Sequence, residues 1–296
     1  MEIRKVAVLG AGRLGRGIAE CAAHKGYDVI LFSQGARGQD ALRRIERSLD
    51  RKLAKWAITE PEKRLILGKI SYTLDLKELS KVDLVVEATI DQFYTKQELL
   101  RTADHLCRPD VVFITTSSTL KVSDLARVIS RNDSLVGLHF IPPVPSVPVV
   151  EMTTAYNTSS AAIETAKHFA SRLGKKVLTI QESPGLVNPR SLMILVNEAA
   201  WMLSEGVADV RTVETIIKES WGMRQGPLEI ADRLGLDLVL NWMTQLQAEF
   251  GDRYAPCPLL RRYVREKRLG LKTRLGFFAY TEDDVLVFEE EQEQED

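Results

Sequence analysis

Cysteine is scarce in this chain of 296 residues, which has only three. Cys21, Cys107 and Cys257 are far apart, and none belongs to a Cys-x-x-Cys pair. Disulfide-stabilised domains have an even and dense set of cysteines, and structural zinc sites have closely spaced pairs of them. The pattern therefore indicates neither a disulfide framework nor a metal site, and it favours a reducing compartment.

Long apolar runs and an excess of charge of one sign are also absent. No stretch approaches the roughly 18 apolar residues of a membrane span, and the opening MEIRKVAVLG does not resemble a signal peptide. The 41 acidic and 40 basic residues give a net charge of −1, which argues against binding nucleic acid through bulk charge. We therefore predict a globular, cytoplasmic protein without a membrane or nucleic-acid partner.

What the chain does contain is a series of short apolar runs separated by segments with helical periodicity. The runs are KVAVLG, DVILFS, VDLVVEA, DVVFITT, SLVGLHF, VPVVEMT and KKVLTI. This alternation is typical of a mostly parallel sheet covered by helices on both faces. The expected fold class is α/β, with a doubly wound sheet of the Rossmann type followed by an all-α domain.

The change from strands to helices comes after Ser183-Pro184-Gly185. Apolar residues from Leu192 to Leu203 follow helical spacing, and Gly206 stands where such a helix would end. We predict a nucleotide-binding domain at 1–182, a helical domain at 183–288 for substrate and dimer contacts, and a disordered acidic tail at 289–296.

The helical segment is rich in large apolar residues. They include Trp201, Met202, Trp221, Leu228, Ile230, Leu234, Leu236 and Trp242. Part of this apolar surface can be buried against a second copy of the chain, which predicts a homodimer through the helical domain. The alternative is that all of these side chains fill the core of their own domain.

A glycine-rich turn follows the first apolar run. Gly10-Ala11-Gly12-Arg13-Leu14-Gly15 comes directly after a strand and opens a helix. In such GxGxxG turns the first glycine allows a tight bend, the second lets the backbone approach a pyrophosphate, and the third permits close packing of helix on strand. Because a second strand follows at Asp28–Phe32, the turn predicts a dinucleotide site. Its predicted cofactor contacts are Gly10, Gly12, Leu14 and Gly15.

The acid expected at the end of the second strand is missing. In NAD-binding domains a carboxylate at this point accepts hydrogen bonds from the adenosine ribose. Here the strand is followed by Ser33 and Gln34, and Arg37 comes shortly after. A hydroxyl and a nearby guanidinium suit a 2′-phosphate, so NADP competes with NAD as the expected cofactor. Arg37 can equally be a solvated loop residue.

One of only four histidines has a position suited to catalysis. His139 follows an apolar strand, so it is expected at the carboxyl edge of the sheet, where open α/β sheets bind ligands. Glu151 ends the next apolar run, and Ser118 ends the run that starts at Val111. A carboxylate on one imidazole nitrogen fixes the tautomer and leaves the other nitrogen as a general base.

Longer segments give a more specific signal. They are VVEATIDQFYTKQEL, TSSTLKVSDLA, GLHFIPPVPSVPVVE, ESPGLVNPR, WGMRQGPLEIADRLGLD and PLLRRYVREKRLGLKTRLGFFAY. Together they resemble the motifs of the 3-hydroxyacyl-CoA dehydrogenases over nearly the whole chain, up to about Tyr280. The resemblance implies an NAD(P)-dependent oxidoreductase that interconverts a 3-hydroxyacyl-CoA and the 3-ketoacyl-CoA.

The resemblance also implies a role for each site residue. His139 would accept the 3-hydroxyl proton while hydride leaves the same carbon, Glu151 would orient the imidazole, and Ser118 would hydrogen-bond the substrate oxygen. The remaining positions implied by the family are Asp91 and Lys96 for the cofactor, Ser48 and Lys55 for CoA, and Asn188 for the substrate.

A charge pattern supports the CoA positions independently. The apolar stripe of one predicted helix is Leu42, Ile45, Leu49, Leu53 and Trp56, and its other faces have Arg43, Arg44, Arg47, Arg51 and Lys55. This concentration of basic residues suits the phosphates of CoA. An ordinary solvated helix surface is the alternative.

The chain departs from the family pattern at side-chain amides. Thr116 and Pro142 stand where the family has asparagine, and Pro189 aligns with a third asparagine, although Asn188 is one residue earlier. Arg274 replaces a glycine of the closing motif. Because proline has no side-chain amide, these changes predict an altered substrate or a weakened enzyme.

Two other functions are compatible with these departures. One is dehydrogenation of another β-hydroxy acid, either free or attached to a carrier protein. The other is binding of a nucleotide without catalysis. Retention of Ser118, His139 and Glu151 favours an enzyme, and the basic helix favours a CoA thioester.

Overall fold

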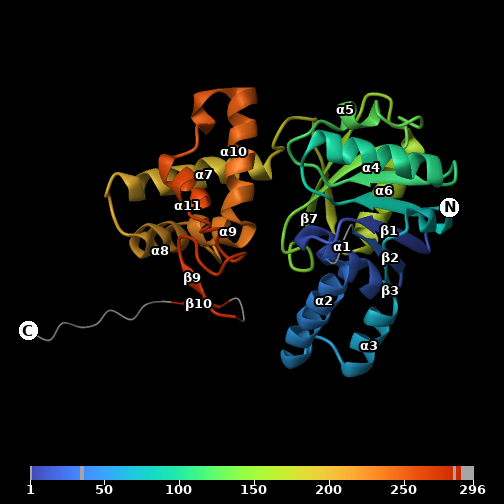
Figure 1. Cartoon of the computed structure of the whole chain (residues 1–296), viewed down its shortest axis with the longest axis horizontal. Coiled ribbons are helices and arrows are strands. Elements are labelled where there is room, and N and C mark those ends of the chain that lie inside the picture. The colour runs from blue at the N-terminus through green and yellow to red at the C-terminus, as the bar shows by residue number, and fades with distance from the viewer. Residues whose placement is uncertain (1, 34–36, 283–284, 288–296) are drawn as a thin grey trace, which may run out of the picture. The chain divides into compact units, whose positions relative to one another are not determined.

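The chain forms two compact units, residues 1–186 and 187–296 (Figure 1). The computed structural model describes residues 2–33, 37–282 and 285–287. The predicted acidic tail at 289–296 lies outside these residues. Within the described part of the chain, no helix is both long enough and apolar enough to cross a membrane.

The first unit is built on an eight-stranded sheet with the order β3-β2-β1-β4-β5-β6-β7-β8. Its strands are β1 Lys5–Leu9, β2 Asp28–Phe32, β3 Ile70–Thr73, β4 Leu84–Glu87, β5 Val112–Thr115, β6 Leu135–Phe140, β7 Val149–Thr154 and β8 Lys176–Thr179. Every neighbouring pair is parallel except β6 and β7, which are antiparallel. The predicted doubly wound, mostly parallel sheet is confirmed.

Helices cover both faces of this sheet because successive residues of a strand point to opposite sides. The helices are α1 Arg13–His24, α2 Arg37–Ala54, α3 Glu60–Gly68, α4 Phe93–Leu106, α5 Val122–Ala126 and α6 Ser160–Arg172, with a 3₁₀ turn, η1, at Leu76–Lys81. Val6 and Val8 of β1 pack with α1, α2 and α6 on one face. Ala7 and Leu9 pack with α4 and α5 on the other.

The predicted apolar stripe of α2 is wrong at its last residue. Ile45 and Leu49 are fully buried, and Leu42 and Leu53 pack partly against the same core. Trp56, however, is 94% exposed. The helix ends at Ala54 and Trp56 takes a left-handed backbone with φ of 56°, so helical periodicity no longer sets the direction of its side chain.

The second unit is helical, as predicted. It contains α7 Asn188–Ser204, α8 Val210–Ser220, α9 Pro227–Leu234, α10 Leu236–Phe250 and α11 Pro258–Arg265, a 3₁₀ turn, η2, at Asp252–Tyr254, and a small hairpin of β9 Ala279–Tyr280 and β10 Leu286–Val287. Leu228, Leu236 and Trp242 fill its core. Trp221 is 64% exposed and is not part of this core.

The closing segment of the second unit is held by one buried carboxylate. Asp232 of α9 accepts hydrogen bonds from the amides of Phe277 and Phe278, both at 2.9 Å, and from the Tyr280 hydroxyl at 3.2 Å. Gly276 lies directly against this carboxylate, because a Cβ at Gly276 would stand 2.0 Å from Asp232 Oδ1. Burial raises the pKa of Asp232 to about 7.

This raised pKa predicts that the stability of the second unit depends on pH. Folded Asp232 binds a proton that the unfolded chain releases above its ordinary pKa of 3.8, so the free energy of unfolding should fall as the pH rises through about 7. The full effect of this carboxyl is roughly 4 kcal/mol. We expect Asp232→Asn to lack this contribution when thermal unfolding is followed from about pH 5 to pH 8.

The matched control is Asp237→Asn, which removes an exposed carboxylate paired with Lys272. This variant should show the pH dependence of the parent chain. If the parent and Asp232→Asn differ in stability by the same amount at every pH, the buried carboxyl does not titrate in this range.

Candidate functional site

The glycine turn lies where three strands of the first unit end. The amide of Gly10 donates to the carbonyl of Phe32 at the end of β2, at 2.8 Å. A Cβ on Gly10 would stand 2.4 Å from the carbonyl oxygen of Ala88, just after β4, and one on Gly15 would stand 1.8 Å from the Gly10 carbonyl oxygen. Gly10 also has a φ of 120°. Both positions therefore require glycine.

Gly12 has a different environment from its two neighbours in the motif. It caps the N-terminus of α1, no side chain caps this helix end, and a Cβ on Gly12 would meet nothing within 4 Å. A helix N-terminus without a side-chain cap, with open space beside its first glycine, fits an anionic group such as the pyrophosphate of a dinucleotide. Leu14 is half-buried against the core beneath the turn.

The loop between β6 and β7 also comes to this end of the sheet. A Cβ on Gly17 of α1 would stand 3.0 Å from the side chain of Val144. The buried ammonium of Lys175 donates to the carbonyls of Val144 and Val147. The sequence analysis did not identify Lys175. Its ammonium holds the loop that follows His139 through hydrogen bonds to backbone carbonyls.

His139 and Glu151 form a direct pair. They are opposite each other in the antiparallel register of β6 and β7, and His139 Nδ1 lies 2.7 Å from Glu151 Oε2. Both side chains are buried. The Nε2 atom of His139 makes no hydrogen bond within the described part of the chain. A buried imidazole with one nitrogen on a carboxylate is suited to proton transfer at the other.

Ser118 is tied to Asp91, another residue singled out from the sequence. The amide and hydroxyl of Ser118 both donate to Asp91 Oδ2, at 3.1 Å. The carboxylate also accepts from Ser117 Oγ at 2.5 Å and from the amide and hydroxyl of Thr119. Five hydrogen bonds thus fix the loop after β5 to the loop after β4.

Lys96 has a buried carboxylate partner that the sequence analysis did not identify. Its ammonium is 1% exposed and lies 2.9 and 2.7 Å from the two carboxylate oxygens of Glu87, the last residue of β4. Thr89 and Thr115 donate further hydrogen bonds to Glu87. The signal for this pair was an acid at the end of an otherwise apolar strand, nine residues before a lysine.

Asp91 completes a group of three buried charges. Its Oδ1 atom is 3.8 Å from the Lys96 ammonium, which together with hydrogen bonds from Ser117, Ser118 and Thr119 lowers the pKa of Asp91 although burial opposes this. The group therefore has two carboxylates and one ammonium at the carboxyl edge of the sheet. It connects the loops after β4 and β5.

The other predicted positions are spread along the chain. Ser33 follows β2 and its carbonyl accepts from Tyr72 OH at 3.0 Å, whereas Gln34 and the side chain of Arg37 lie outside the described residues. Ser48 is half-buried on α2, and Lys55 follows that helix and is exposed. Asn188 begins α7 and so belongs to the second unit.

The residues that depart from the family pattern have distinct settings. Thr116 is buried directly after β5, and Pro142 precedes Pro143 through a cis peptide bond in the loop after His139. Pro189 is buried in the first turn of α7. Arg274 has a φ of 62°, a conformation that favours glycine, and its guanidinium pairs with Glu282 at 2.7 Å.

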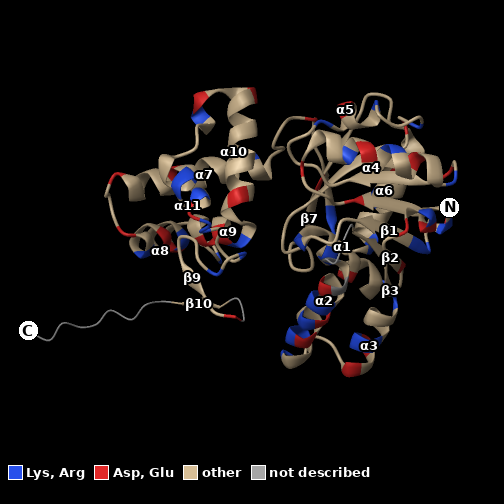
Figure 2. Ribbon diagram, viewed as in Figure 1, with Lys and Arg blue, Asp and Glu red and all other residues tan. Residues whose placement is uncertain are grey.

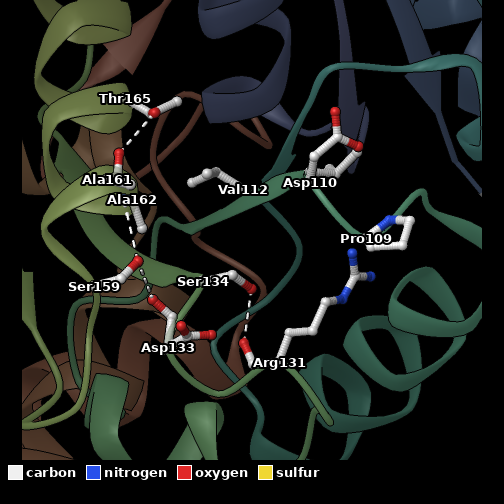
Figure 3. A pocket seen from close by; sticks show the side chains of 11 residues that line it. Pro109, Asp110, Val112, Arg131, Asp133, Ser134, Ser159, Ala161, Ala162 and Thr165 are labelled. Atoms are coloured by element: carbon white, nitrogen blue, oxygen red, sulfur yellow. Dashed lines mark hydrogen bonds between the residues drawn. The ribbon is translucent and has the colours of Figure 1, made fainter. Parts of the chain in front are cut away.

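A hollow in the first unit lies at the opposite edge of the sheet. It has a volume of about 290 Å³ and is lined by residues such as Val112 at the start of β5, Ser134 just before β6 and Ser159 just before α6 (Figure 3). Because these residues stand at the amino ends of strands, the hollow is separate from the His139 site.

Comparison with known families identifies both units. Residues 5–183 match the NAD-binding domain of 3-hydroxyacyl-CoA dehydrogenases, and residues 185–280 match the C-terminal domain of the same enzymes. The chain belongs to the 3-hydroxyacyl-CoA dehydrogenase family. Family membership confirms the resemblance seen in the sequence, makes the chain an oxidoreductase, and indicates a nicotinamide cofactor.

Individual members of the 3-hydroxyacyl-CoA dehydrogenase family match along nearly their full length. A probable 3-hydroxybutyryl-CoA dehydrogenase of Bacillus subtilis is 34% identical over 95% of this chain and 99% of its own length. Among solved structures, FadB2 of M. tuberculosis has a TM-score of 0.90 at 32% identity, and (S)-3-hydroxybutyryl-CoA dehydrogenase of Ralstonia eutropha has 0.83 at 33%. Both alignments cover 95% of this chain and all of the other.

The buried pair of Lys96 and Glu87 predicts a large loss of stability when one partner is removed. We expect Lys96→Met to lower the free energy of unfolding by about 3–5 kcal/mol, because the Glu87 carboxylate is left buried without a cation. The double variant with Glu87→Gln should recover part of this loss. Urea denaturation followed by circular dichroism measures both.

Lys81→Met is the matched control, since it breaks an exposed pair with Glu78 and should cost less than about 1 kcal/mol. An equal, small effect of Lys96→Met and Lys81→Met would contradict a structural role for the buried pair.

Proposed function

We propose that this member of the family interconverts 3-hydroxyacyl-CoA and 3-ketoacyl-CoA thioesters with a nicotinamide dinucleotide. The observation that carries the proposal is the buried His139–Glu151 pair, which stands at the same end of the sheet as the glycine turn. The names of the Bacillus subtilis and Ralstonia eutropha relatives support this substrate class.

His139 is the proposed general base and acid. In the direction of oxidation its Nε2 accepts the proton of the substrate 3-hydroxyl, and the carbon–oxygen bond becomes a carbonyl as C3 loses hydride. The nicotinamide, when bound, would accept the hydride that leaves C3 of the substrate. Glu151 holds Nδ1 at 2.7 Å, so it keeps the imidazole in one orientation and stabilises the imidazolium that forms.

Ser118 is proposed to bind the substrate oxygen. Its backbone amide donates to Asp91, so the residue is fixed while its hydroxyl can turn from Asp91 toward a reacting oxygen. A hydroxyl donor placed at the developing charge favours the transition state over the ground state. Asp91 and Lys96 hold the loop in this arrangement, and we propose that both residues also border the cofactor.

We assign the CoA portion of the substrate to the side of α2 that is rich in arginine, which we call its basic flank. Figure 2 shows both basic and acidic residues along this helix. Glu46 and Asp50 face α3 and pair with Lys63 at 3.9 and 2.5 Å. Ser48 lies on the flank that also presents basic side chains, and the Lys55 ammonium makes no ion pair within the described residues. Phosphate oxygens fit this flank better than the acidic one. Asn188 of the second unit is a further proposed substrate contact.

A second candidate substrate is another β-hydroxy acid, free or carried by a protein. The observation that favours it is Pro142, which stands in the loop after His139 where the family has an amide. Activity on a free 3-hydroxy acid that exceeds activity on the corresponding CoA thioester would favour this alternative.

Replacement of His139 is the direct test of the chemistry. We expect His139→Gln to reduce kcat with acetoacetyl-CoA by about 10²–10⁴-fold, because glutamine cannot transfer a proton at this position. The measurement is reduced-cofactor oxidation across a panel of 3-ketoacyl-CoA compounds with both nicotinamide cofactors.

His168→Gln is the matched control, because this histidine is exposed on α6 and should have no effect. Absence of turnover with every acyl length and both cofactors in the parent chain would refute the proposed activity. Tight cofactor binding without turnover would instead indicate a nucleotide-binding protein.

We also propose a homodimer formed through the second unit. Ile216 of α8 is 59% exposed, and Trp221, which caps that helix, is 64% exposed. Large apolar side chains at such exposure favour burial against a second copy. Trp221→Glu is expected to shift the chain toward monomer in sedimentation velocity, because a charge would be buried at the interface.

Trp56→Glu in the first unit is the matched control, since Trp56 is even more exposed but lies outside the second unit. It should leave the oligomeric state unchanged. A parent chain that sediments as a monomer at all concentrations would contradict the dimer.

The compartment that we propose is the cytoplasm. All three cysteines are free, and burial raises the thiol pKa of Cys21 and Cys107 to about 11. Buried thiols in their protonated form react slowly with oxidants and need no disulfide partner, which fits a reducing compartment.

A further inference from the structure

The segment that ends the first unit is buried, although the boundary between two domains usually falls in an exposed linker. Pro184, Gly185 and Leu186 are all buried. The amide of Leu186 donates to the carbonyl of Ser183 at 3.0 Å, and Gly185, the third residue of this turn, has a φ of 76°. Proline and glycine in the two central positions are typical of a type II turn. The turn is therefore an ordered element of the first unit rather than a loose connection.

This turn is hydrogen-bonded to Ser118, the residue that we propose to bind the substrate oxygen. The amide of Gly185 donates to the Ser118 carbonyl at 2.7 Å. The amide of Ser118 donates to Asp91 at 3.1 Å. Both backbone polar groups of Ser118 are therefore bonded to segments that are distant in the sequence, one after β4 and the other after β8. Residues 116–121, which connect β5 to α5, are called the Ser118 loop below.

The sheet order shows how far the chain returns to make this contact. β8 is an edge strand and lies three positions away from β5, whose end leads into the Ser118 loop. The chain after β8 therefore passes the positions of β7 and β6 before Gly185 meets Ser118. At the start of this path, the amide of Ile180 still follows the sheet and donates to the carbonyl of Met152 in β7 at 2.9 Å. A further contact is needed between Ile180 and the turn to hold the returning segment.

Glu182 supplies this contact. Its Oε2 atom accepts from the amide of Ser123 at 2.7 Å and from the Ser123 hydroxyl at 3.0 Å. Ser123 lies in the first turn of α5, whose N-cap residue, Lys121, makes no side-chain capping hydrogen bond. The unpaired amides at a helix N-terminus favour a carboxylate. Glu182 thus joins the returning segment to the helix that follows the Ser118 loop, and it does so three residues before Gly185.

We propose that Glu182 is a positioning residue for the reaction, because it holds the turn that fixes the backbone of Ser118. The segment with Glu182 and Gly185 contacts the chain at the start of α5 and at Ser118 itself. Asp91 holds the same loop from the side of β4. The hydroxyl of Ser118 can therefore turn between Asp91 and a substrate oxygen without movement of its backbone. This inference rests on the proposed function for the role of Ser118.

Replacement of Glu182 tests the positioning role. Glu182→Met removes the acceptor and keeps the length of the side chain. We expect kcat with acetoacetyl-CoA to fall about 10–100-fold while KM changes by less than about 3-fold, because the Ser118 hydroxyl acts mainly in the transition state. Glu182→Gln retains an oxygen acceptor for both donors and should stay within about 5-fold of the parent. Gln181→Met is the matched control, since Gln181 is exposed on the same segment and should leave kcat unchanged.

A double variant separates positioning of Ser118 from a general loss of structure. In a Ser118→Ala background, Glu182→Met should lower kcat by less than about 2-fold further, because the hydroxyl through which it acts is already absent. Damage to the fold would instead multiply the two losses. Ser123→Ala removes one of the two hydrogen bonds and serves where Glu182→Met gives too little folded protein. Its smaller loss of about 3–10-fold should likewise vanish in the Ser118→Ala background.

Amide hydrogen exchange tests the contact without a substrate. Exchange in residues 116–126 should be at least about 10-fold faster in Glu182→Met than in the parent, and unchanged in Gln181→Met. Unchanged exchange, unaffected kcat, or losses that multiply with Ser118→Ala would overturn the proposal. A parent chain without turnover of any acyl-CoA would refute the proposed function. In that case faster exchange in Glu182→Met still supports its hold on the Ser118 loop, and unchanged exchange overturns it.

Discussion

The antiparallel pairing of β6 with β7 is the constraint on which the site depends. In a sheet that is otherwise parallel, this one reversal brings His139 directly opposite Glu151. Side chains alternate between the two faces of a strand, so a slip of one residue would place the two on opposite faces and break the 2.7 Å contact. Burial of both strands on both faces makes such a slip costly, because apolar residues would leave the core with it.

Buried charges help to hold the loops around this pair. Lys175 donates to the carbonyls that follow His139, while Lys96 joins Glu87 and Asp91 behind Ser118. A buried cation is costly unless each of its donors is satisfied, and breaking one partner leaves the other uncompensated. This makes the arrangement intolerant of change and keeps Ser118 in a fixed position while its hydroxyl remains free to turn.

The backbone organisation could be predicted from the sequence because it follows from local patterns. Apolar runs separated by helical periodicity define the strands, and the spacing of glycines defines the turn at Gly10. The pairing of His139 with Glu151 could also be predicted from neighbouring apolar runs, although both residues lie within strands β6 and β7 rather than at the ends expected from the sequence. The single-residue error at Trp56 arose where helical periodicity stops, a boundary that depends on the end of α2 rather than on the pattern itself.

The partners of buried charges could not be predicted in the same way. Glu87 and Lys96 lie nine residues apart. The acid at the end of an apolar strand is visible in the sequence, but the sequence does not show that a helix brings this particular lysine to it. Asp232 and the amides of Phe277 and Phe278 are even further apart along the chain. These contacts depend on tertiary packing, which selects one partner from many acids and bases of similar spacing. Periodicity predicts which side chains are buried but not which polar atoms meet.

Chemistry and recognition are supported by separate parts of this structure. The proton-transfer pair belongs to two adjacent strands, whose register leaves little freedom, whereas the departures from the family pattern lie in loops and at helix ends, as at Pro142, Pro189 and Arg274. Loops and helix surfaces can change with small effects on the core, so the cofactor and substrate preferences of such a fold can shift while its proton-transfer geometry is retained.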